Sequence, residues 1–568
     1  MPQTNDRDAV RLGLAEAWLA QDPDPETRAE LAELVEGVRR GDPGASVELA
    51  DRFDHRLAFG TAGLRGAIAA GPNRMNRVLV SQAAAGLAAF LLERTAPGTT
   101  PSVVIGYDGR KNSAVFARDS AEIMAGAGVR AILLPRLLPT PVLAFAVRHL
   151  DTSAGVMVTA SHNPPNDNGY KVYLGDRDEG SQIVAPADAE IAACIDRVAA
   201  TIAVPELPRG EFETADESVV DEYVRRTALV ATAPSAQPRV VYTAMHGVGW
   251  ETTARVLAEA GFEPPALVDE QISPDPAFPT VAFPNPEEPG AMDLSFARAR
   301  EAGADLIIAN DPDADRLAIA IPDAASADGF RRLTGNEVGL LLGWQAARRA
   351  SSQGGDSGPN GTLACSIVSS PGLEAVARAY DLEFTATLTG FKWISRAPAL
   401  VFGFEEALGY LVNPETVRDK DGISAAVAFL SLAAELQAAG TTVSEHLDEF
   451  VERFGCHDSA QVSIRVTELA RIDEVMARLR ATPPTSVGGI RVERIDDLRD
   501  GFGDLPPSDV LRIVLAGDAR VMVRPSGTEP KLKVYIDAAS SAGTVAERRA
   551  AASAVVTALE TGMRELVG

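Results

Sequence analysis

Residues 154–173 read Ala154-Gly-Val-Met-Val-Thr-Ala-Ser-His-Asn-Pro-Pro-Asn-Asp-Asn-Gly-Tyr-Lys-Val-Tyr173. Both ends are apolar and β-prone, and the middle, from Asn163 to Gly169, consists of residues that favour turns. This pattern predicts a strand, a loop and a second strand, with the hydroxyl of Ser161 on the loop. Loops that leave the strands of an α/β sheet usually carry its chemistry. The simpler alternative is an Asn-Pro turn whose serine only bonds to nearby backbone; motifs elsewhere in the chain favour a functional serine.

Length, charge and cysteine content limit the class of protein. At about 150 residues per domain, 568 residues suggest about four domains. A hydrophobic content of 46% is that of a soluble globular protein. The formal charge of −26 argues against nucleic acid or an anionic membrane as a partner. Cys194, Cys365 and Cys456 form no metal-ligand or redox pattern, so we expect a reducing compartment and a packing role for them.

The apolar segments are short. The first eight residues contain no apolar core of a signal peptide, and no stretch approaches about 18 uninterrupted apolar residues. We therefore expect a cytoplasmic protein that does not span a membrane.

The pattern of the first 450 residues predicts helices followed by repeated strand–helix units. Residues 1–57 resemble acidic helices broken at residues 22–25 and 41–44. Apolar β-type runs then alternate with Ala-rich helical stretches, which is typical of βαβ units around a largely parallel sheet. The predicted strands include 102–106, 239–243, 305–309 and 363–368, and the predicted helices include 117–127, 252–260, 295–302 and 372–380.

The last hundred residues have a different pattern. Residues 459–466, 489–494, 511–516 and 531–537 alternate like half-buried strands, and Gly517-Asp518 predicts a hairpin turn before residues 520–524. We predict an α/β protein with three similar α/β domains of mixed or parallel sheets and a smaller C-terminal α+β domain. The predicted domains are 1–208 with a helical N-terminal extension, 209–328, 329–453 and 454–568. Residues 351–361 are of low complexity and predict a loop in the third domain.

A second motif, Asn310-Asp-Pro-Asp-Ala-Asp-Arg316, follows an apolar run. Its three carboxylates would splay apart on a helix, but they can converge on one hard cation in a turn at the end of a strand. Ligands that are all oxygen suit Mg²⁺ better than Zn²⁺. A Ca²⁺-binding EF-hand loop is excluded because its sixth position would be Arg316 and its twelfth Pro322. A solvated acidic turn is the remaining alternative.

A third motif, Gly403-Phe-Glu-Glu-Ala-Leu-Gly-Tyr410, has Thr389-Gly-Phe-Lys-Trp393 before it and Arg418-Asp-Lys-Asp-Gly422 after it. Adjacent carboxylates point in different directions, so we interpret them as acceptors for vicinal sugar hydroxyls and not as an acid–base pair. Taken alone, the motif fits an ordinary amphipathic turn better.

The fourth motif is Arg524-Pro-Ser-Gly-Thr-Glu-Pro-Lys531. A guanidinium, two hydroxyls and a glycine that exposes backbone N–H groups form an anion-binding loop. The motif lacks the Lys-Ser/Thr order of a nucleotide-binding P-loop, and a plain hairpin loop is the alternative. A further Gly-rich turn, Phe59-Gly-Thr-Ala-Gly-Leu-Arg-Gly66, carries Arg65. A serine nucleophile, a Mg²⁺ site, a hydroxyl-binding loop and a phosphate site together indicate phosphoryl transfer to and from a sugar phosphate.

The order and content of these four motifs resemble the α-D-phosphohexomutase family, which includes phosphoglucomutases and phosphomannomutases. The resemblance runs from about Phe59 to Tyr535. The longer forms of the motifs are similar to a branch with bacterial phosphoglucomutases and animal phosphopentomutases. The resemblance implies four domains in a heart-like arrangement with a mobile fourth domain.

The resemblance also implies roles for individual residues. Ser161 corresponds to the family's phosphoserine. Together with the three carboxylates of the second motif, it also corresponds to the family's Mg²⁺ ligands. The resemblance implies that glucose 1,6-bisphosphate primes the serine. The implied catalytic residues are Ser161, His162, Lys171, Arg65 and Lys420, with Lys171 or Lys420 as proton-transfer partner. The implied metal ligands are Ser161, Asp311, Asp313 and Asp315. The implied substrate-binding residues are Arg316, Thr389, Gly390, Lys392, Glu405, Ala407, Arg524, Ser526, Gly527 and Thr528.

One position departs from the family pattern. Many hexomutases have a serine where this chain has Ala407, which leaves the choice of sugar open. We expect hexose 1-phosphate and hexose 6-phosphate as substrates, glucose before mannose, with ribose or deoxyribose phosphates as the alternative. A hydrolase that loses its phosphoserine to water and a non-catalytic sugar-phosphate sensor are rival functions. The expected partners are small sugar phosphates, with no nucleic acid and no membrane, for a monomer or a homodimer.

Overall fold

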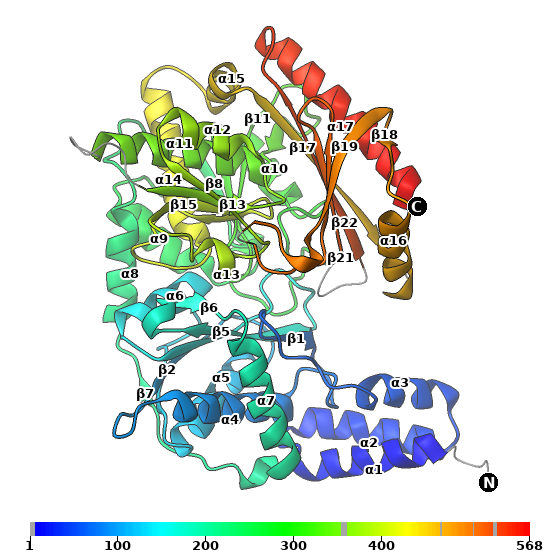
Figure 1. Cartoon of the computed structure of the whole chain (residues 1–568). Helices are drawn as coiled ribbons and strands as arrows, with labels where there is room; N and C mark the ends of the chain where they lie inside the picture. Colours follow the sequence, from blue (N-terminus) through cyan, green and yellow to red (C-terminus); the bar gives the residue numbers. More distant parts are fainter. Residues whose placement is uncertain (1–5, 354–360, 466–468, 504, 526–530, 568) are drawn as a thin grey trace. The chain divides into compact units, whose positions relative to one another are not determined.

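The computed structural model describes residues 6–353, 361–465, 469–503, 505–525 and 531–567. In these residues the chain forms four sheets, each with its own helices (Figure 1). The sheets belong to two compact units. The first comprises Met1–Arg331 and Asn413–Val427, and the second comprises Arg332–Val412 and Ala428–Gly568.

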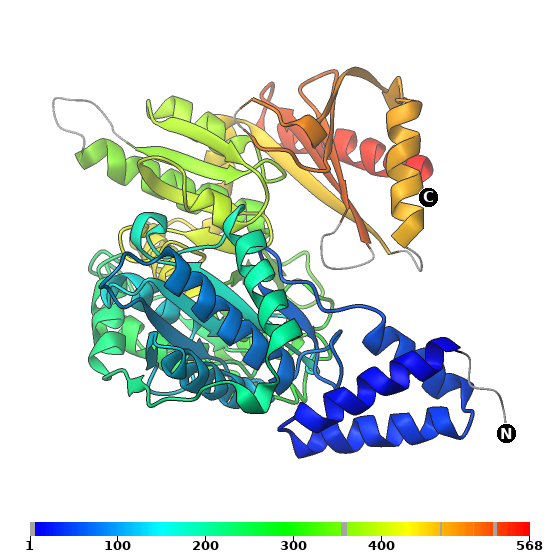
Figure 2. The ribbon, with the colours of Figure 1, turned by 60° about the horizontal axis from the view of Figure 1, so that its bottom comes forward.

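Three helices precede the first sheet: α1 (Asp6–Gln21), α2 (Pro25–Arg39) and α3 (Pro43–Phe53). The side chains of Asp24 and Asp42 accept hydrogen bonds from backbone N–H groups at the starts of α2 and α3, and each is followed by proline at the first helical position. These breaks are where the sequence predicts them. The three helices lie side by side in both views (Figures 1 and 2), and Trp18 of α1 meets Phe53 of α3 edge to face, with ring centroids 6.2 Å apart.

The first sheet has the strand order β1-β5-β4-β2-β3-β7, with β6 paired to β5. Strands β2, β3 and β4 are parallel, whereas β5 runs antiparallel to β4. The ends of β2 and β4 are therefore neighbours at one edge of the sheet. The elements are β1 (Leu64–Ala67), α4 (Arg77–Arg94), β2 (Ser102–Tyr107), α5 (Ser113–Gly126), β3 (Arg130–Leu133), α6 (Thr140–His149), β4 (Ala154–Val158), β5 (Asp167–Leu174), β6 (Ser181–Gln182), α7 (Ala187–Thr201) and β7 (Glu213–Thr214).

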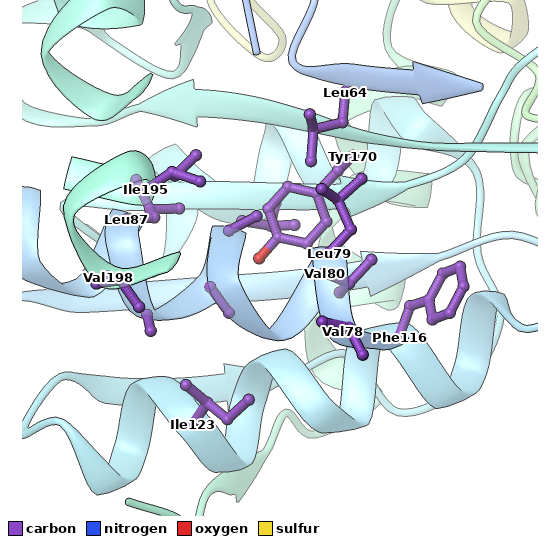
Figure 3. Close-up of a cluster of buried hydrophobic side chains, with 14 of the residues drawn as sticks. Leu64, Val78, Leu79, Val80, Leu87, Phe116, Ile123, Tyr170, Ile195 and Val198 are labelled. Carbon is purple, nitrogen blue, oxygen red and sulfur yellow. The ribbon is translucent and has the colours of Figure 1, made fainter. Parts of the chain in front are cut away.

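The core of this domain is built around α4, which is apolar on nearly all sides and lies between α5 and α7 (Figure 3). Leu79 of α4 and Leu64 of β1 lie next to the ring of Tyr170 on β5, and all three side chains are buried. Burial of each such side chain stabilises the fold by about 1.5–3 kcal/mol. This packing fixes β5, the strand that follows the serine loop.

The second sheet has the order β12-β11-β10-β8-β9 and also belongs to the first unit, up to Arg331. Strands β8, β9 and β10 are parallel, and β11 returns antiparallel to β10 after a tight turn at residues 311–316. The elements are α8 (Ser218–Ala228), β8 (Val240–Thr243), α9 (Gly249–Glu259), β9 (Ala266–Leu267), α10 (Asp293–Ala302), β10 (Leu306–Asn310), β11 (Leu317–Pro322) and β12 (Phe330–Arg332).

The third sheet, with the order β14-β13-β15-β16, belongs to the second unit. Its strands β13, β14 and β15 are parallel, and β16 is antiparallel to β15. The elements are α11 (Gly335–Gln353), β13 (Thr362–Ser366), α12 (Gly372–Ala379), β14 (Glu383–Thr387), α13 (Phe391–Ile394), β15 (Leu400–Glu405), β16 (Gly409–Leu411), α14 (Gly422–Ala438) and α15 (Val443–Phe454). Most of the predicted low-complexity loop, residues 354–360, lies outside the described residues.

The fourth sheet is antiparallel, with the order β17-β22-β21-β20-β19-β18. Gly517 and Asp518 both have positive φ, 79° and 60°, as the tight hairpin turn predicted between β20 and β21 requires. The elements are β17 (Cys456–Arg465), α16 (Leu469–Ala481), β18 (Ser486–Val487), β19 (Ile490–Asp497), β20 (Leu511–Leu515), β21 (Arg520–Pro525), β22 (Lys531–Ser540) and α17 (Val545–Val567). Three α/β sheets followed by an α+β domain confirm the predicted fold class.

Among the described helices, none taken singly is long and apolar enough to cross a membrane. The pair α14 and α15, bent by 94° at their junction, meets the length and composition criteria only when counted together. The three cysteines are buried and form no disulfide.

Candidate active site

The serine loop leaves β4 and places its hydroxyl against a carboxylate of the second domain. Ser161 has a φ of 52°, which non-glycine residues rarely adopt, and its side chain is buried. Its Oγ donates a hydrogen bond to Asp311 Oδ2 over 2.7 Å and lies 3.2 Å from His162 Nδ1. The hydroxyl thus lies at the junction of two domains within the first unit.

The carboxylates of Asp311, Asp313 and Asp315 converge in the turn between β10 and β11. Ala314, in the middle of the turn, has a φ of 54°, which turns the chain back so that the three side chains meet. One oxygen from each lies within 4.8 Å of the others, and all three residues are buried. Gly247 packs against this turn so closely that a Cβ there would lie 2.2 Å from Pro312 Cα. The predicted convergence of the three carboxylates is confirmed.

Two groups from the first domain contact this turn. Thr140, at the start of α6, donates from Oγ1 to Asp313 Oδ2 over 2.6 Å and from its backbone N–H to the Asp313 carbonyl over 2.9 Å. Lys171 on β5 donates from Nζ to Asp313 Oδ2 over 2.8 Å and to Asp315 Oδ2 over 2.9 Å. The first domain therefore supplies the serine, a hydroxyl and an ammonium group to one carboxylate cluster.

Lys420 reaches the same cluster from the segment Asn413–Val427. Its Nζ lies 3.4 Å from Asp315 Oδ2, and its side chain is buried. The neighbouring carboxylates fix the segment, because Asp419 accepts from the Tyr173 hydroxyl over 2.8 Å and Asp421 accepts from the Tyr223 hydroxyl over 3.0 Å. Lys420 is thereby held among residues that precede it by almost 200 positions or more.

The charges of the cluster influence one another strongly. Burial raises the pKa of Asp311 well above its ordinary value, and the neighbouring Asp313 and Asp315 raise it further. Burial alone would lower the pKa of Lys171, but the two carboxylates that it contacts raise it above the ordinary value. The pKa of His162 is far below its ordinary value because the ring is buried, and Arg316 and Arg65 add positive charge nearby. His162 is therefore neutral at pH 7.

The donor set fits a hard divalent cation. All candidate ligand atoms are oxygens, as Mg²⁺ prefers. Among the described residues, Asp313 Oδ1 and Asp315 Oδ1 are buried without a hydrogen-bond partner. A buried polar atom without a partner destabilises a protein unless another group, such as a cation, contacts it. These two atoms are available to a metal ion beside the hydroxyl of Ser161.

Arg65 and Arg316 complete the predicted residues of the first unit. Arg65, on β1, donates from Nη1 to Asn163 Oδ1 in the serine loop over 3.1 Å. The backbone N–H of Arg316 donates to Asp311 Oδ1 over 3.0 Å, and its Nε lies 3.9 Å from Asp315 Oδ1. The structure therefore gathers every predicted catalytic and metal-binding residue in this unit.

The two adjacent glutamates of the second unit have different surroundings. The carboxylate of Glu406 accepts hydrogen bonds from Ser369 Oγ over 2.9 Å and from Ser366 Oγ over 3.1 Å, at the end of β13. Glu405 is the last residue of β15 and is half-buried. Ala407 follows in the turn to β16 and is half-buried as well. Serine hydroxyls thus fix Glu406 within the protein.

The predicted substrate-binding residues of the second unit come from three segments. Thr389, Gly390 and Lys392 lie between β14 and the end of α13, and Arg524 lies on β21. Tyr535 on β22 packs in one buried cluster with Leu388, just before Thr389, and with Met522 of β21. Burial raises the pKa of Tyr535, and the charges of Glu406, Arg524 and Glu405 also act on it. Ser526, Gly527 and Thr528 lie outside the described residues.

Four residues that the sequence analysis did not single out complete the first unit's site: Thr140, Arg110, Asp419 and Asp421. Three of them had a signal in the sequence, since Asp419, like Asp421, adjoins Lys420. Arg110 follows β2 by three residues, as Ser161 follows β4, and the ends of these neighbouring strands share one edge of the sheet. Asp421 stands next to Lys420 in a motif already quoted. Thr140 gave no signal, because its contact with Asp313 spans 173 residues.

Family models cover the chain in four consecutive segments. The models describe phosphoglucomutase/phosphomannomutase alpha/beta/alpha domains I, II and III and the C-terminal domain, and they match residues 56–201, 221–324, 334–454 and 462–554. The chain belongs to the phosphoglucomutase/phosphomannomutase family. It is therefore a phosphomutase-family enzyme, and the resemblance predicted from the motifs is confirmed.

Relatives within this family carry different substrate names. A protein of Haemophilus influenzae named "Probable phosphomannomutase" is 52% identical over 495 residues, with 87% of this chain and 98% of the relative covered. The phosphopentomutase of Mus musculus is 34% identical over 577 residues, with 93% and 90% covered. A crystal structure from Thermus thermophilus, provisionally named a phosphomannomutase, matches with a TM-score of 0.69 at 25% identity, with 90% of this chain and 99% of that chain covered.

Proposed function

We propose that this family member interconverts hexose 1-phosphates and hexose 6-phosphates through a phosphoserine at Ser161. The observation that carries the proposal is the 2.7 Å hydrogen bond from Ser161 Oγ to Asp311, one member of the buried carboxylate cluster. A serine hydroxyl is a weak nucleophile and its phosphate ester is slow to break. A metal ion at this cluster would assist both the attack by the serine hydroxyl and the cleavage of its phosphate ester.

In the proposed cycle, Ser161 begins as its phosphate ester. A hydroxyl oxygen of the bound hexose monophosphate attacks the phosphorus, the bond from phosphorus to Oγ breaks, and Ser161 receives the proton that the sugar hydroxyl loses. The product of this half-cycle is a hexose 1,6-bisphosphate. When the other phosphate of that molecule returns to Ser161, the monophosphate has been isomerised and the enzyme is regenerated. Glucose 1,6-bisphosphate primes a serine that has lost its phosphate.

The proposed metal ligands are Asp311, Asp313, Asp315 and the phosphate of Ser161. Bound Mg²⁺ supplies positive charge that offsets the charge of the transferring phosphoryl group. Lys171 and Lys420 contact the same carboxylates, at 2.8–2.9 Å and 3.4 Å, and stabilise the negative charge of the transition state together with Arg65 and Arg316. Neutral His162 lies 3.2 Å from the nucleophile and orients its hydroxyl.

The second unit supplies the proposed binding residues for the rest of the substrate. Glu405, which the family motif assigns to sugar recognition, is proposed to accept hydrogen bonds from sugar hydroxyls, whereas Ser366 and Ser369 hold the carboxylate of Glu406 within the protein. Thr389, Gly390 and Lys392 are proposed to contact the sugar beside Glu405. Arg524, with Ser526, Gly527 and Thr528 of the same loop, is proposed to bind the phosphate that does not react.

The sugar is proposed to be a hexose, with both glucose and mannose 1-phosphate accepted. The relative named as a phosphomannomutase, 52% identical, supports a hexose. The relative named as a phosphopentomutase, 34% identical, keeps ribose and deoxyribose phosphates as the second candidate. Ala407 provides no hydrogen-bonding side chain near Glu405, which weakens discrimination between sugars.

The test follows purified protein by ³¹P NMR with glucose 1-phosphate, Mg²⁺ and a trace of glucose 1,6-bisphosphate. We expect glucose 6-phosphate to form with no release of inorganic phosphate. Inorganic phosphate as the main product would show a hydrolase. Binding of the sugar phosphate with no product would show a sensor. Either result would overturn the proposal, and the same assay with mannose and ribose 1-phosphates identifies the sugar.

A further inference from the structure

The guanidinium of Arg110 lies within the curve of the serine loop. Its Nη2 donates to the carbonyl oxygens of Ser161 and Asn163, each over 2.6 Å. Its Nη1 donates to the carbonyl oxygens of Pro164 over 2.8 Å and Asp167 over 3.2 Å. One side chain therefore contacts four backbone carbonyls in seven consecutive residues, and only 1% of that side chain is exposed.

The surroundings of Arg110 hold its charge in place. The carboxylate of Asp108 lies 3.5 Å from Arg110 Nε and is itself buried. The ring of Phe278, from the second domain, covers the guanidinium at 4.9 Å from its centroid. A buried charge is costly unless it is paired and hydrogen-bonded. The Nη1 and Nη2 bonds and the nearby Asp108 carboxylate meet most of that requirement, while Arg110 Nε and Asp108 Oδ2 have no hydrogen-bond partner among the described residues. A lysine could not replace the Nη1 and Nη2 bonds, because one ammonium cannot reach four carbonyls in a planar fork.

The serine loop needs the hydrogen bonds of Arg110 most at Ser161, because the backbone of this residue is strained. Ser161 adopts a φ of 52°, and a left-handed conformation is unfavourable for a non-glycine residue unless its surroundings impose it. The Arg110 bond fixes the carbonyl of this same residue, and the Ser161 Oγ then meets Asp311 at 2.7 Å. Turn bonds from Asn163 N to the Ala160 carbonyl and from Asp167 N to the Pro164 carbonyl close the loop, but they leave the Ser161 carbonyl to Arg110.

We propose that Arg110 is the positioning residue of the nucleophile, which holds the Ser161 backbone so that its Oγ faces the carboxylate cluster. Arg110 contacts neither substrate nor metal in this role; it acts through the loop. Asp108 orients the guanidinium, and Phe278 joins the loop to the domain that carries the carboxylates. The inference rests on Ser161 as the phosphate carrier.

The test compares Arg110→Lys with Arg118→Lys, a matched change of an arginine on α5 whose side chain is 70% exposed. A misplacement of about 1 Å can lower a rate about 100-fold. We therefore expect Arg110→Lys to lower kcat for glucose 1-phosphate about 100-fold, with KM unchanged, and Arg118→Lys to keep wild-type values. Hydrogen exchange should accelerate in the peptide that covers residues 159–169 and stay unchanged elsewhere.

A wild-type kcat in Arg110→Lys, or faster exchange throughout the first unit, would overturn the inference. Asp108→Asn tests the same role if Arg110→Lys does not fold, because it leaves the guanidinium and the hydrogen-bonding Oδ1 in place. For Asp108→Asn we expect about a tenfold lower kcat with unchanged KM, because Arg110 loses one charged partner. A wild-type kcat together with a wild-type rate of hydrogen exchange in this variant would overturn the inference.

Ser161→Ala separates the two proposals. An active Ser161→Ala protein refutes the proposed function, whereas an inactive Ser161→Ala protein beside a fully active Arg110→Lys protein refutes only the role of Arg110.

Discussion

The hydroxyl of Ser161 donates a hydrogen bond to Asp311 Oδ2 over 2.7 Å, although the two residues are 150 positions apart. Each follows the end of a strand in its own sheet. The contact exists because Thr140, Lys171 and Phe278 hold the first and second domains together around the serine loop and the carboxylate turn. The serine hydroxyl and the carboxylate turn therefore form a single site within one compact unit.

Ser161→Ala should lower mutase turnover by several orders of magnitude, because the covalent carrier of the phosphate is lost. Turnover of glucose 1-phosphate and circular dichroism check the rate and the fold. Ser81→Ala is the matched control, since Ser81 is also buried and its Oγ has no hydrogen-bond partner among the described residues. Full activity in a folded Ser161→Ala protein would refute the mechanism.

Asp313→Ala should abolish activity together with its dependence on Mg²⁺, because three carboxylates must converge on the ion. Titration of activity with Mg²⁺ after treatment with EDTA measures both effects. Asp328→Ala, which removes a carboxylate that is 56% exposed in the same domain, should leave the titration unchanged. An EDTA-treated wild-type enzyme with an undiminished rate would mean that the cluster is not a metal site.

Arg524→Ala should weaken binding of hexose monophosphates much more than binding of unphosphorylated hexoses. A charge-assisted hydrogen bond contributes roughly 1.5–3 kcal/mol, and its loss corresponds to about a 10- to 160-fold higher Kd. Calorimetric titrations with glucose 1-phosphate and glucose provide the comparison. Arg491→Ala, which removes a guanidinium that is 72% exposed, is the control. Equal losses for the two ligands would assign Arg524 a structural role.

Ala407 predicts broad sugar acceptance. A wrong sugar leaves few buried polar groups unpaired in a site with few fixed polar contacts, so it is rejected weakly. We expect glucose 1-phosphate to have the highest kcat/KM, with measurable turnover of mannose 1-phosphate and slower turnover of ribose and deoxyribose 1-phosphates. Ala407→Ser should widen the differences among the four. Higher kcat/KM for the pentose phosphates would instead identify a phosphopentomutase, and strict selectivity for one hexose would refute the argument.

The pKa of Asp421, raised by burial from 3.8 to about 6, predicts a pH-dependent effect on stability. The folded protein holds this proton to higher pH than the unfolded chain, so the contribution of Asp421 to the free energy of unfolding falls as pH rises from about 4 to 6. The Asp421→Asn variant cannot ionise at this position. Its stability relative to wild type should therefore be about 2 kcal/mol greater at pH 7.5 than at pH 4.5.

Urea unfolding at the two pH values, followed by fluorescence, measures this difference for wild type and variant. Asp328→Asn changes an exposed carboxylate of the same unit and should shift stability equally at both pH values. An Asp421→Asn effect that does not change with pH would show that the carboxyl is ionised at pH 4.5 in the folded protein.

Local patterns predicted the strands and turns well because each strand is a short apolar run with its own turn residues. The hairpin at Gly517-Asp518 and the proline-led starts of α2 and α3 are examples. The order of the four motifs also identified Ser161, Asp313 and Asp315, which lie next to Asp311 in the structure. The contacts of Thr140 and Asp419 could not be derived in this way, because each joins segments that are far apart in the sequence. The place of Arg110 after β2 was a signal, but its bonds to the serine loop could not be derived from the local pattern. Residues 526–528 of the phosphate loop remain a prediction from the motif.

The return of Asn413–Val427 to the first unit affects how the protein is made. Translation adds about 5–20 residues per second. Lys420 is synthesised roughly 90 residues after Arg331, the last residue of the unit's main segment, so on the order of 4–18 s pass between the two. During that time Tyr173 and Tyr223 lack the carboxylates that they contact in the finished protein. A nascent chain therefore carries Ser161 and its carboxylate cluster for several seconds before it acquires the second lysine of the same site.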